Sequence, residues 1–172
     1  MYCEKFLVSR NSAVALGCFD GIHIGHRAVI AAAVDFAREN SLKSIVFKIE
    51  RSENLIPPYE TAQIIQSQGV DTLITQPLNH EFRNLTCEEF VREILRNQLQ
   101  AKFVSVGENF RFGKNAAGNA ALLRELCAGI GIEVNVTPLV RVDGEVVSST
   151  KIRELIKSGN LAKAAQYLGR DL

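Results

Sequence analysis

The chain has 172 residues, of which 47% are hydrophobic and 23% charged, a composition that is ordinary for a globular protein. The formal net charge of +1 gives no field that would attract nucleic acid or an anionic membrane, and the apolar runs are too short for a membrane span. The start, Met1-Tyr2-Cys3-Glu4-Lys5, lacks the regions of a signal peptide. We therefore expect one cytoplasmic domain over residues 1–172 that binds neither nucleic acid nor membrane.

Apolar runs alternate with amphipathic segments along the chain. The apolar runs predict strands at Val14–Phe19, Ser44–Ile49, Thr72–Thr75, Phe103–Val106 and Ile132–Thr137. The segments between them predict helices at Arg27–Glu39, Tyr59–Gln68, Cys87–Asn97 and Asn119–Ala128, the third opened by a capping box of Thr86 and Glu89. This alternation is typical of βαβ units. We expect a doubly wound, Rossmann-like α/β fold with five parallel strands and helices on both faces.

The last part of the chain has a different pattern. Residues 140–147 alternate around Asp143-Gly144, which predicts a hairpin. Two short helices are expected after it, at Lys151–Lys157 and at Leu161–Leu168, the second capped by Asn160.

The segment between the first strand and the first helix carries the strongest functional signal. It reads Gly17-Cys18-Phe19-Asp20-Gly21-Ile22-His23-Ile24-Gly25-His26. A helix N-terminus offers unpaired N–H groups and a partial positive charge, and glycines let a ligand approach the backbone. Two imidazoles three residues apart add N–H donors for phosphate oxygens. The segment therefore predicts a nucleotide-handling site.

Two further segments fit the same site. The loop Gly107–Lys114 follows the fourth strand, and in a doubly wound sheet such loops meet at one edge. The segment Ser148–Arg153 opens a helix, with Ser149 or Thr150 as a natural N-cap. Lys151 and Arg153 are cations in that first turn and oppose the helix dipole, a placement that makes sense if an anion binds there. We expect a second phosphate contact at this helix.

Each signal also has an ordinary explanation. The H-x-G-H pattern is short, Asp20 suits any turn, the Ser-Ser-Thr run suits any helix start, and Phe110 and Phe112 suit a packed βα turn. His80 is expected to be a solvated loop residue. The cysteines at 3, 18, 87 and 127 and the three histidines lack zinc spacing, so we expect free thiols and no protein-bound metal. The three segments are all predicted to lie at one edge of the sheet, which favours a single site.

Together these residues resemble the adenylyltransferase module of bacterial bifunctional FAD synthetases, within the HxGH nucleotidyltransferases. The resemblance is carried by six segments: Leu16–His26, Gly69–Asp71, Leu85–Val91, Gly107–Gly113, Ser148–Arg153, and Gly159 with Leu168–Arg170. It implies transfer of AMP from ATP, bound with Mg²⁺, to FMN, giving FAD and pyrophosphate.

The resemblance also implies roles for individual residues. His23 and His26 would hold the ATP phosphates and stabilise the pentavalent α-phosphorus, and Asn109 would orient phosphates. Ser149, Thr150 and Arg153 would bind the β- and γ-phosphates. The remaining ATP-pocket residues would be Gly17, Cys18, Phe19, Asp20, Gly25, Gly107 and Phe112.

The sequence departs from the family on the flavin side. The family's Phe-x-Pro-His-Pro loop is replaced by the stretch Phe47–Pro58, Cys18 stands where Asn is common, and Tyr59-Glu60-Thr61-Ala62 lacks the usual Glu-Lys. The chain ends at Leu172, where the family's riboflavin kinase domain would begin, so riboflavin phosphorylation is expected to be absent. Two alternatives stay open: a nucleotidyltransferase for another phosphate acceptor, and a non-catalytic nucleotide- or flavin-binding paralogue.

Overall fold

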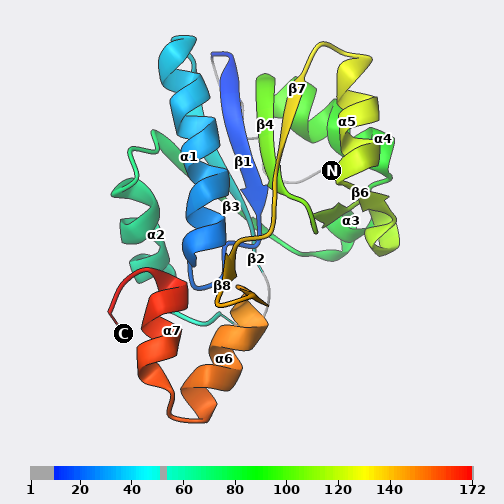
Figure 1. Cartoon of the computed structure of the whole chain (residues 1–172). Coiled ribbons are helices and arrows are strands. Elements are labelled where there is room, and N and C mark those ends of the chain that lie inside the picture. Colours follow the sequence, from blue (N-terminus) through cyan, green and yellow to red (C-terminus); the bar gives the residue numbers. More distant parts are fainter. Residues whose placement is uncertain (1–9, 51–53, 172) are drawn as a thin grey trace.

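A five-stranded parallel sheet forms the centre of the computed structural model, which describes residues 10–50 and 54–171 (Figure 1). The strand order is β3-β2-β1-β4-β7, and each neighbouring pair is parallel, as expected. The strands are β1 (Ser12–Gly17), β2 (Lys43–Glu50), β3 (Thr72–Pro77), β4 (Ala101–Gly107) and β7 (Glu133–Thr137). Because β1 pairs with both β2 and β4, the winding reverses there, and ligands bind at the carboxyl ends of strands at such a point.

Helices and short ribbons connect the strands. Between them lie α1 (Ile24–Glu39), α2 (Pro58–Gln66), α3 (His80–Asn84), α4 (Cys87–Glu89), the π-helix η1 (Phe90–Gln98) that continues it, and α5 (Ala120–Ala128). The loop before α5 contains β5 (Arg111–Phe112), the 3₁₀ turn η2 (Lys114–Ala116) and β6 (Gly118–Asn119). After β7 come β8 (Arg141–Val142), β9 (Glu145–Val146), α6 (Ser149–Lys157) and α7 (Leu161–Leu168).

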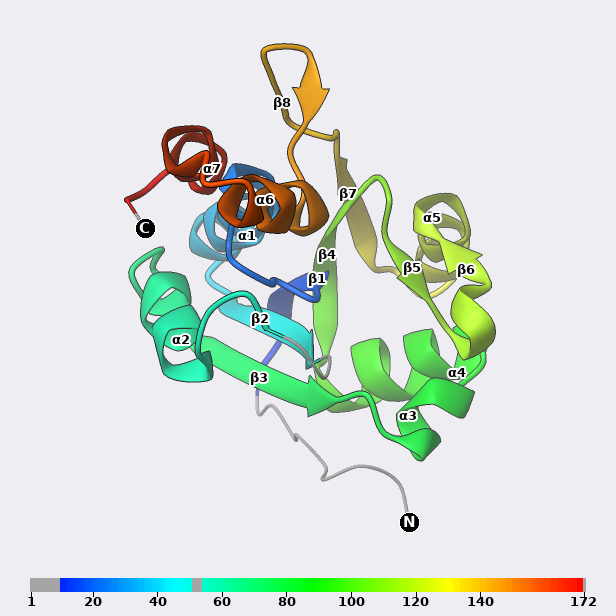
Figure 2. The same cartoon turned by 90° about the horizontal axis from the view of Figure 1, so that it is seen from below.

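Helices cover both faces of the sheet, as predicted (Figure 2). Successive side chains of β1 point to opposite faces. Ala13 and Ala15 pack with α1 and α2 in one buried cluster, whereas Val14 and Leu16 pack with α3, η1 and α5 in another. The small side chains of Ala13 and Ala15 leave room for α1 to lie close against the centre of the sheet.

Three local predictions need correction. The first strand ends at Gly17, not Phe19, because Phe19 has a left-handed backbone with φ 46°. The first helix begins at Ile24, three residues before the predicted Arg27, because the His23 side chain caps it. His80 is exposed but opens α3 instead of lying in a loop. The capping box of Thr86 and Glu89 is confirmed.

The hairpin and the last two helices form a small unit beyond the carboxyl edge of the sheet (Figure 1). Asp143 and Gly144 both have positive φ, 51° and 79°, as a two-residue hairpin of type I′ requires. Val147, α6 and α7 share a third buried cluster, against which Ile24 of α1 and Leu55 pack. The unit is therefore joined to the start of α1, where the predicted site lies.

The β5–β6 ribbon allows a test of core packing at Gly118. A Cβ atom there would lie 2.5 Å from Phe112 Cε1 and 2.8 Å from Cys87 Sγ, and both side chains are buried. We expect Gly118→Ala to lower the free energy of unfolding by about 1–3 kcal/mol, measured by urea denaturation. Gly129→Ala is the matched control, since its nearest atom would lie at 3.7 Å. Equal stability of the two variants would contradict the packing argument.

Candidate active site

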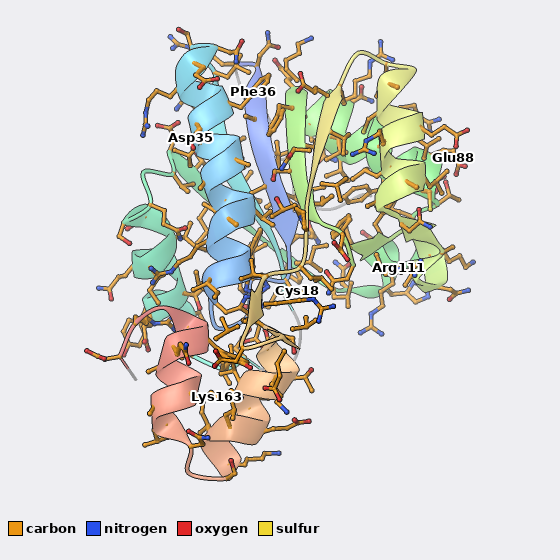
Figure 3. All side chains as sticks on the ribbon, viewed as in Figure 1. Cys18, Asp35, Phe36, Glu88, Arg111 and Lys163 are labelled. Carbon is orange, nitrogen blue, oxygen red and sulfur yellow. The ribbon has the colours of Figure 1, made fainter. Side chains whose placement is uncertain are left out.

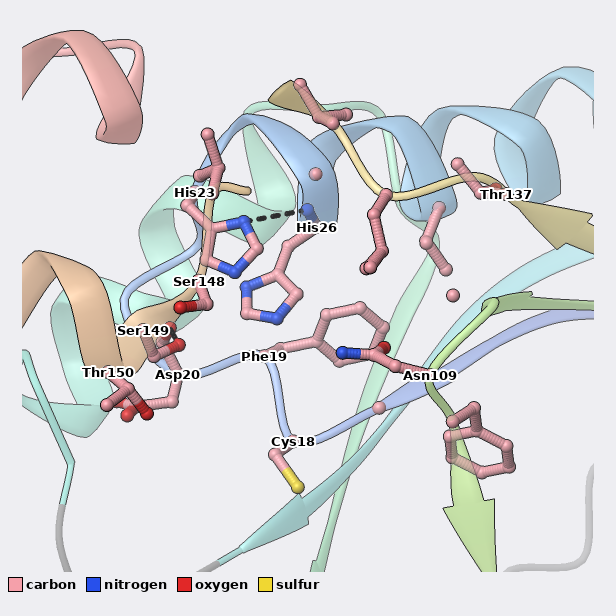
Figure 4. A pocket seen from close by; sticks show the side chains of 18 of the residues that line it. Cys18, Phe19, Asp20, His23, His26, Asn109, Thr137, Ser148, Ser149 and Thr150 are labelled. Carbon is pink, nitrogen blue, oxygen red and sulfur yellow. Dashed lines mark hydrogen bonds between the residues drawn. The ribbon is translucent and has the colours of Figure 1, made fainter. Parts of the chain in front are cut away.

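A cavity of about 580 Å³ opens at the carboxyl edge of the sheet, beside the winding reversal (Figure 4). Its walls come from the β1–α1 turn, the loops after β4 and β7, the end of β2, and the start of α6. Two helix N-termini therefore meet at one cavity, those of α1 and α6. The first turns of both helices, which the structure describes in full, contain no acidic residue. The arrangement suits an anionic ligand.

His23 and His26 lie side by side in the β1–α1 turn. Their ring centroids are 3.6 Å apart with the planes 17° from parallel, and Phe19 meets His26 edge-on at 5.5 Å. His23 Nδ1 accepts a hydrogen bond of 3.3 Å from the backbone N–H of His26, drawn dashed in Figure 4. A Cβ on Gly25 would lie only 3.2 Å from the His23 ring. Glycine at this position therefore leaves room for the His23 ring.

The environment keeps both imidazoles neutral at pH 7. Burial lowers the pKa of His23 to about 4, although the Asp20 carboxylate acts in the opposite direction. Burial, and then the neighbouring His23, lower the pKa of His26 well below its usual value. Because Nδ1 of neutral His23 is an acceptor, its proton lies on Nε2. His26 Nδ1 is buried and has no hydrogen-bond partner among the described residues. The two rings can thus offer N–H donors to a ligand.

The pKa of His23 predicts a pH effect on stability. Between pH 6.5 and about 4 the unfolded chain binds a proton that folded His23 does not, so the free energy of unfolding falls as the pH falls through this range. A shift of this size corresponds to about 3 kcal/mol. We expect the His23 ring resonances to titrate near pH 4 in NMR spectra, and His23→Asn, which keeps a helix cap, to reduce the pH dependence of urea unfolding. A midpoint near 6.5 would show that the ring is not desolvated.

Asp20 connects three separate segments at the cavity. Its Oδ2 accepts a 2.5 Å hydrogen bond from Arg153 Nη2, and its Oδ1 accepts one of 2.5 Å from the backbone N–H of Leu55. Its backbone carbonyl accepts from Ser149 Oγ at 2.8 Å. The α6 start and the segment before α2 are therefore both attached to the β1–α1 turn.

The loop after β4 forms another wall. Asn109 lines the cavity, and a Cβ on Gly107 would approach its Oδ1 to 3.2 Å. The backbone N–H of Glu108 donates to the Thr137 carbonyl at 3.0 Å, and its Oε2 accepts from the N–H of Leu139 at 3.1 Å. These bonds hold the β4 and β7 loops together. Cys18, labelled in Figure 3, follows the last residue of β1 and also lines the cavity.

The structure brings nearly all of the predicted site residues to this cavity. Those that line it are Gly17, Cys18, Phe19, Asp20, His23, Gly25, His26, Gly107, Asn109, Ser149, Thr150 and Arg153. Phe112 is not among the described lining residues. The β5–β6 ribbon turns it into the core, where it is 4% exposed and contacts Phe90 and Phe110. The resemblance placed Phe112 in the pocket, whereas the local pattern also suited a packed βα turn, and the structure has its side chain in the core.

Two other features were missed from the sequence. The N-cap of α6 is Ser148, whose side chain accepts from the N–H of Lys151, and not Ser149 or Thr150. The loop after β7 also lines the cavity, with Thr137, Pro138, Leu139 and Val140. The expected parallel sheet contained a usable signal, because the loops that follow its strands leave at the carboxyl edge where the site was expected. Of the altered stretch 47–58, residues 51–53 lie outside the described residues, as does Cys3.

Neither a protein-bound metal cluster nor a membrane span is found in the described part of the chain. Among residues 10–50 and 54–171, no three His, Cys, Asp or Glu side chains are grouped to hold a metal ion. Within the same ranges no helix is long and apolar enough to cross a bilayer.

Sequence comparison identifies the family. Residues 6–151 match the FAD synthetase family. The chain belongs to this family. The FAD synthetase of Listeria monocytogenes is 32% identical to it over 173 residues, which cover 94% of this chain and 70% of that protein. A bifunctional riboflavin kinase/FMN adenylyltransferase of Buchnera aphidicola is 29% identical over 175 residues, covering 95% of this chain.

Comparison of structures supports the same fold. A crystal structure named as a macrolide-efflux protein from Streptococcus pneumoniae superposes with a TM-score of 0.86 and 28% sequence identity, over 96% of this chain. This chain spans 58% of that protein and 56% of the Buchnera relative. It thus corresponds to little more than half the length of these two relatives.

Proposed function

We propose that this FAD synthetase family member transfers AMP from ATP to FMN, giving FAD and pyrophosphate. The observation that carries the proposal is the convergence of two helix N-termini, two stacked neutral imidazoles and Arg153 on one cavity. The names of the relatives agree with this reaction, as FAD synthetase and FMN adenylyltransferase. Phosphoryl-type transfer depends mainly on positioning and charge stabilisation, which these groups can provide.

In the proposed complex the ATP phosphates lie between the starts of α1 and α6. Ser149, Thr150 and Arg153 bind the β- and γ-phosphates, since all three line the cavity at the N-terminus of α6. The Arg153 guanidinium is already held at the cavity by Asp20. Binding of ATP then places phosphate oxygens near a guanidinium whose position is set in advance.

The chemical step is an in-line displacement at the α-phosphorus. An FMN phosphate oxygen forms the new P–O bond, the bond between the α-phosphorus and the α–β bridging oxygen breaks, and pyrophosphate leaves. His23, His26 and Asn109 stabilise the charge on the pentavalent phosphorus by N–H donation. The FMN phosphate is already an anion at neutral pH, so the step requires no general base and no covalent enzyme intermediate.

Mg²⁺ fits this site as a companion of ATP. Mg²⁺ prefers oxygen ligands and is usually held by one or two protein groups together with substrate phosphates. The cavity offers the Asp20 carboxylate and the hydroxyls of Ser149 and Thr150. When bound, the ion supplies charge neutralisation on the phosphates. ATP is an intracellular substrate, and we propose that the reaction takes place in the cytoplasm.

A second candidate function differs only in the acceptor. Lys48, at the end of β2, is 3% exposed, with its Nζ 3.5 Å from Asn54 Oδ1 and 3.9 Å from Glu50 Oε1. The stretch that follows Phe47 lacks the Pro-His-Pro of the family's flavin-side loop, and the buried Lys48 lies at its start. This observation supports a nucleotidyltransferase for another phosphate compound.

The decisive assay is chromatographic detection of FAD from FMN, ATP and Mg²⁺, with pyrophosphate measured in parallel. FAD and pyrophosphate in equal amounts support the first proposal. Pyrophosphate release only with other members of a panel of acceptor phosphates supports the second. Binding of ATP by calorimetry without release for any acceptor would leave the non-catalytic paralogue.

A further inference from the structure

The turn that holds the two histidines has an unfavourable backbone. Phe19 and Ile22 have positive φ, 46° and 44°, within four residues directly before His23, and between them Gly21 has a φ of 77°, which glycine tolerates. Positive φ is rare for a bulky residue and an outlier for a β-branched one such as Ile22. Such a conformation persists only where surrounding groups hold it. The position of the His23 ring therefore depends on contacts made to this turn from elsewhere in the fold.

Arg170, two residues after α7, makes such contacts. Its Nη2 donates to the Gly21 carbonyl at 2.9 Å and its Nη1 to the Ile22 carbonyl at 3.1 Å. Both ends of the guanidinium fork thus hold consecutive carbonyls of the strained turn. Burial, together with the charge of Arg27, lowers the pKa of Arg170 from its very high ordinary value, and the group remains a cation.

The backbone that carries Arg170 is itself firmly attached. Tyr167 and Leu168 are fully buried, and the Tyr167 hydroxyl donates to Glu145 of β9 at 2.8 Å. Gly169 ends α7 in the left-handed conformation, and a Cβ there would lie 2.8 Å from Ile24 Cγ2 in the first turn of α1. The end of α7 is therefore packed directly against the segment that contains the histidines.

We propose that Arg170 is a positioning residue that holds the Gly21–Ile22 backbone in its strained form and so sets the stacked arrangement of His23 and His26. The proposal rests on the proposed adenylyl transfer for its kinetic consequence. Arg170 is not among the described residues that line the cavity, so it acts through the turn and not on the nucleotide. In this way the small C-terminal unit helps to position the histidines at the carboxyl edge of the sheet.

The test compares Arg170→Ala and Arg170→Lys with the parent chain. Arg83→Ala is the matched control, because Arg83 Nε also donates to a backbone carbonyl, that of Leu78 at 3.0 Å, but on α3 away from the cavity. We expect Arg170→Ala to lower kcat for FAD formation roughly 10- to 100-fold with a smaller change in the KM for ATP, as a misplacement of catalytic groups does. Arg170→Lys keeps a cationic N–H donor but cannot bind both carbonyls as the guanidinium does, so it is expected to recover part of the rate.

A second readout needs no catalysis. In the parent chain the buried His23 ring is expected to titrate near pH 4, and in Arg170→Ala its NMR titration should move toward 6.5 as the turn relaxes and admits water. If no variant makes FAD, this shift still tests the positioning role independently of the reaction. An unchanged His23 titration in Arg170→Ala and Arg170→Lys, or a rate loss equal to that of Arg83→Ala, would overturn the proposal.

Discussion

Replacing His26 with alanine is expected to lower the rate of FAD formation by about 10²-fold or more. His26 lies stacked on His23 and edge-on to Phe19 inside the cavity, and its neutral ring can donate an N–H to the developing charge at the α-phosphorus. The loss should appear mainly in kcat, since the donor is needed most in the transition state. Steady-state kinetics with chromatographic detection of FAD measures it.

His80→Ala is the control for this experiment. His80 is exposed on α3 and lies outside the cavity lining, so its loss should leave both kcat and KM close to those of the parent. A His26→Ala rate within a few-fold of the parent would remove His26 from the catalytic step. It would then leave His23, Asn109 and the helix N-termini to stabilise the transition state.

Arg153→Ala should have the second-largest effect. Arg153 is held at the cavity by Asp20, and a guanidinium is well suited to bind phosphate oxygens in two directions. Its loss removes this contact from both bound ATP and the leaving pyrophosphate, and it also leaves the Asp20 carboxylate without its 2.5 Å ion pair. We expect kcat/KM for ATP to fall by roughly 10²- to 10³-fold, with a rise in KM as well as a fall in kcat.

Two further variants separate phosphate binding from simple charge loss. Lys157→Ala removes a cation from the other end of α6, outside the cavity lining, and should change kcat/KM little. Arg153→Lys keeps the charge but loses the planar fork, so it should recover only part of the activity. If Arg153→Lys matched the parent, the bidentate contact would have no role. If Lys157→Ala were as damaging as Arg153→Ala, the effect would come from α6 stability.

The repeating strand and helix pattern was predictable because it depends on local rules. Buried parallel strands need continuous apolar runs, and a capping box such as that of Thr86 and Glu89 is formed within one turn. The exact ends of the strands and helices were harder to predict. The strand end at Gly17 depends on the backbone of Phe19, which the packing of the whole turn forces to positive φ. Local sequence favours a longer strand there and cannot reveal that constraint.

The different positions of Phe110 and Phe112 illustrate what local reasoning misses at the site, because the local pattern suits the same packed position for both. Both Phe110 and Phe112 follow β4 in a segment with a nucleotide-site pattern, yet Phe110 and Arg111 line the cavity and Phe112 lies in the core. The difference arises from the β5–β6 ribbon, which pairs Phe112 with Gly118. That pairing is a contact between residues six positions apart across a turn, with no periodic signal in the sequence.

The fold class could be predicted from apolar periodicity, and the family and the expected phosphate-binding segments from motifs whose residues are neighbours in the chain. How the site is assembled could not be predicted in this way, because it depends on contacts between distant parts of the chain. Asp20 meets Arg153 and Leu55, the β7 loop closes against Glu108, and Arg170 reaches the carbonyls of Gly21 and Ile22. These contacts join residues up to 149 positions apart. They require the strands to be paired and α6 and α7 to be packed beyond the carboxyl edge of the sheet. Local sequence patterns do not predict that packing.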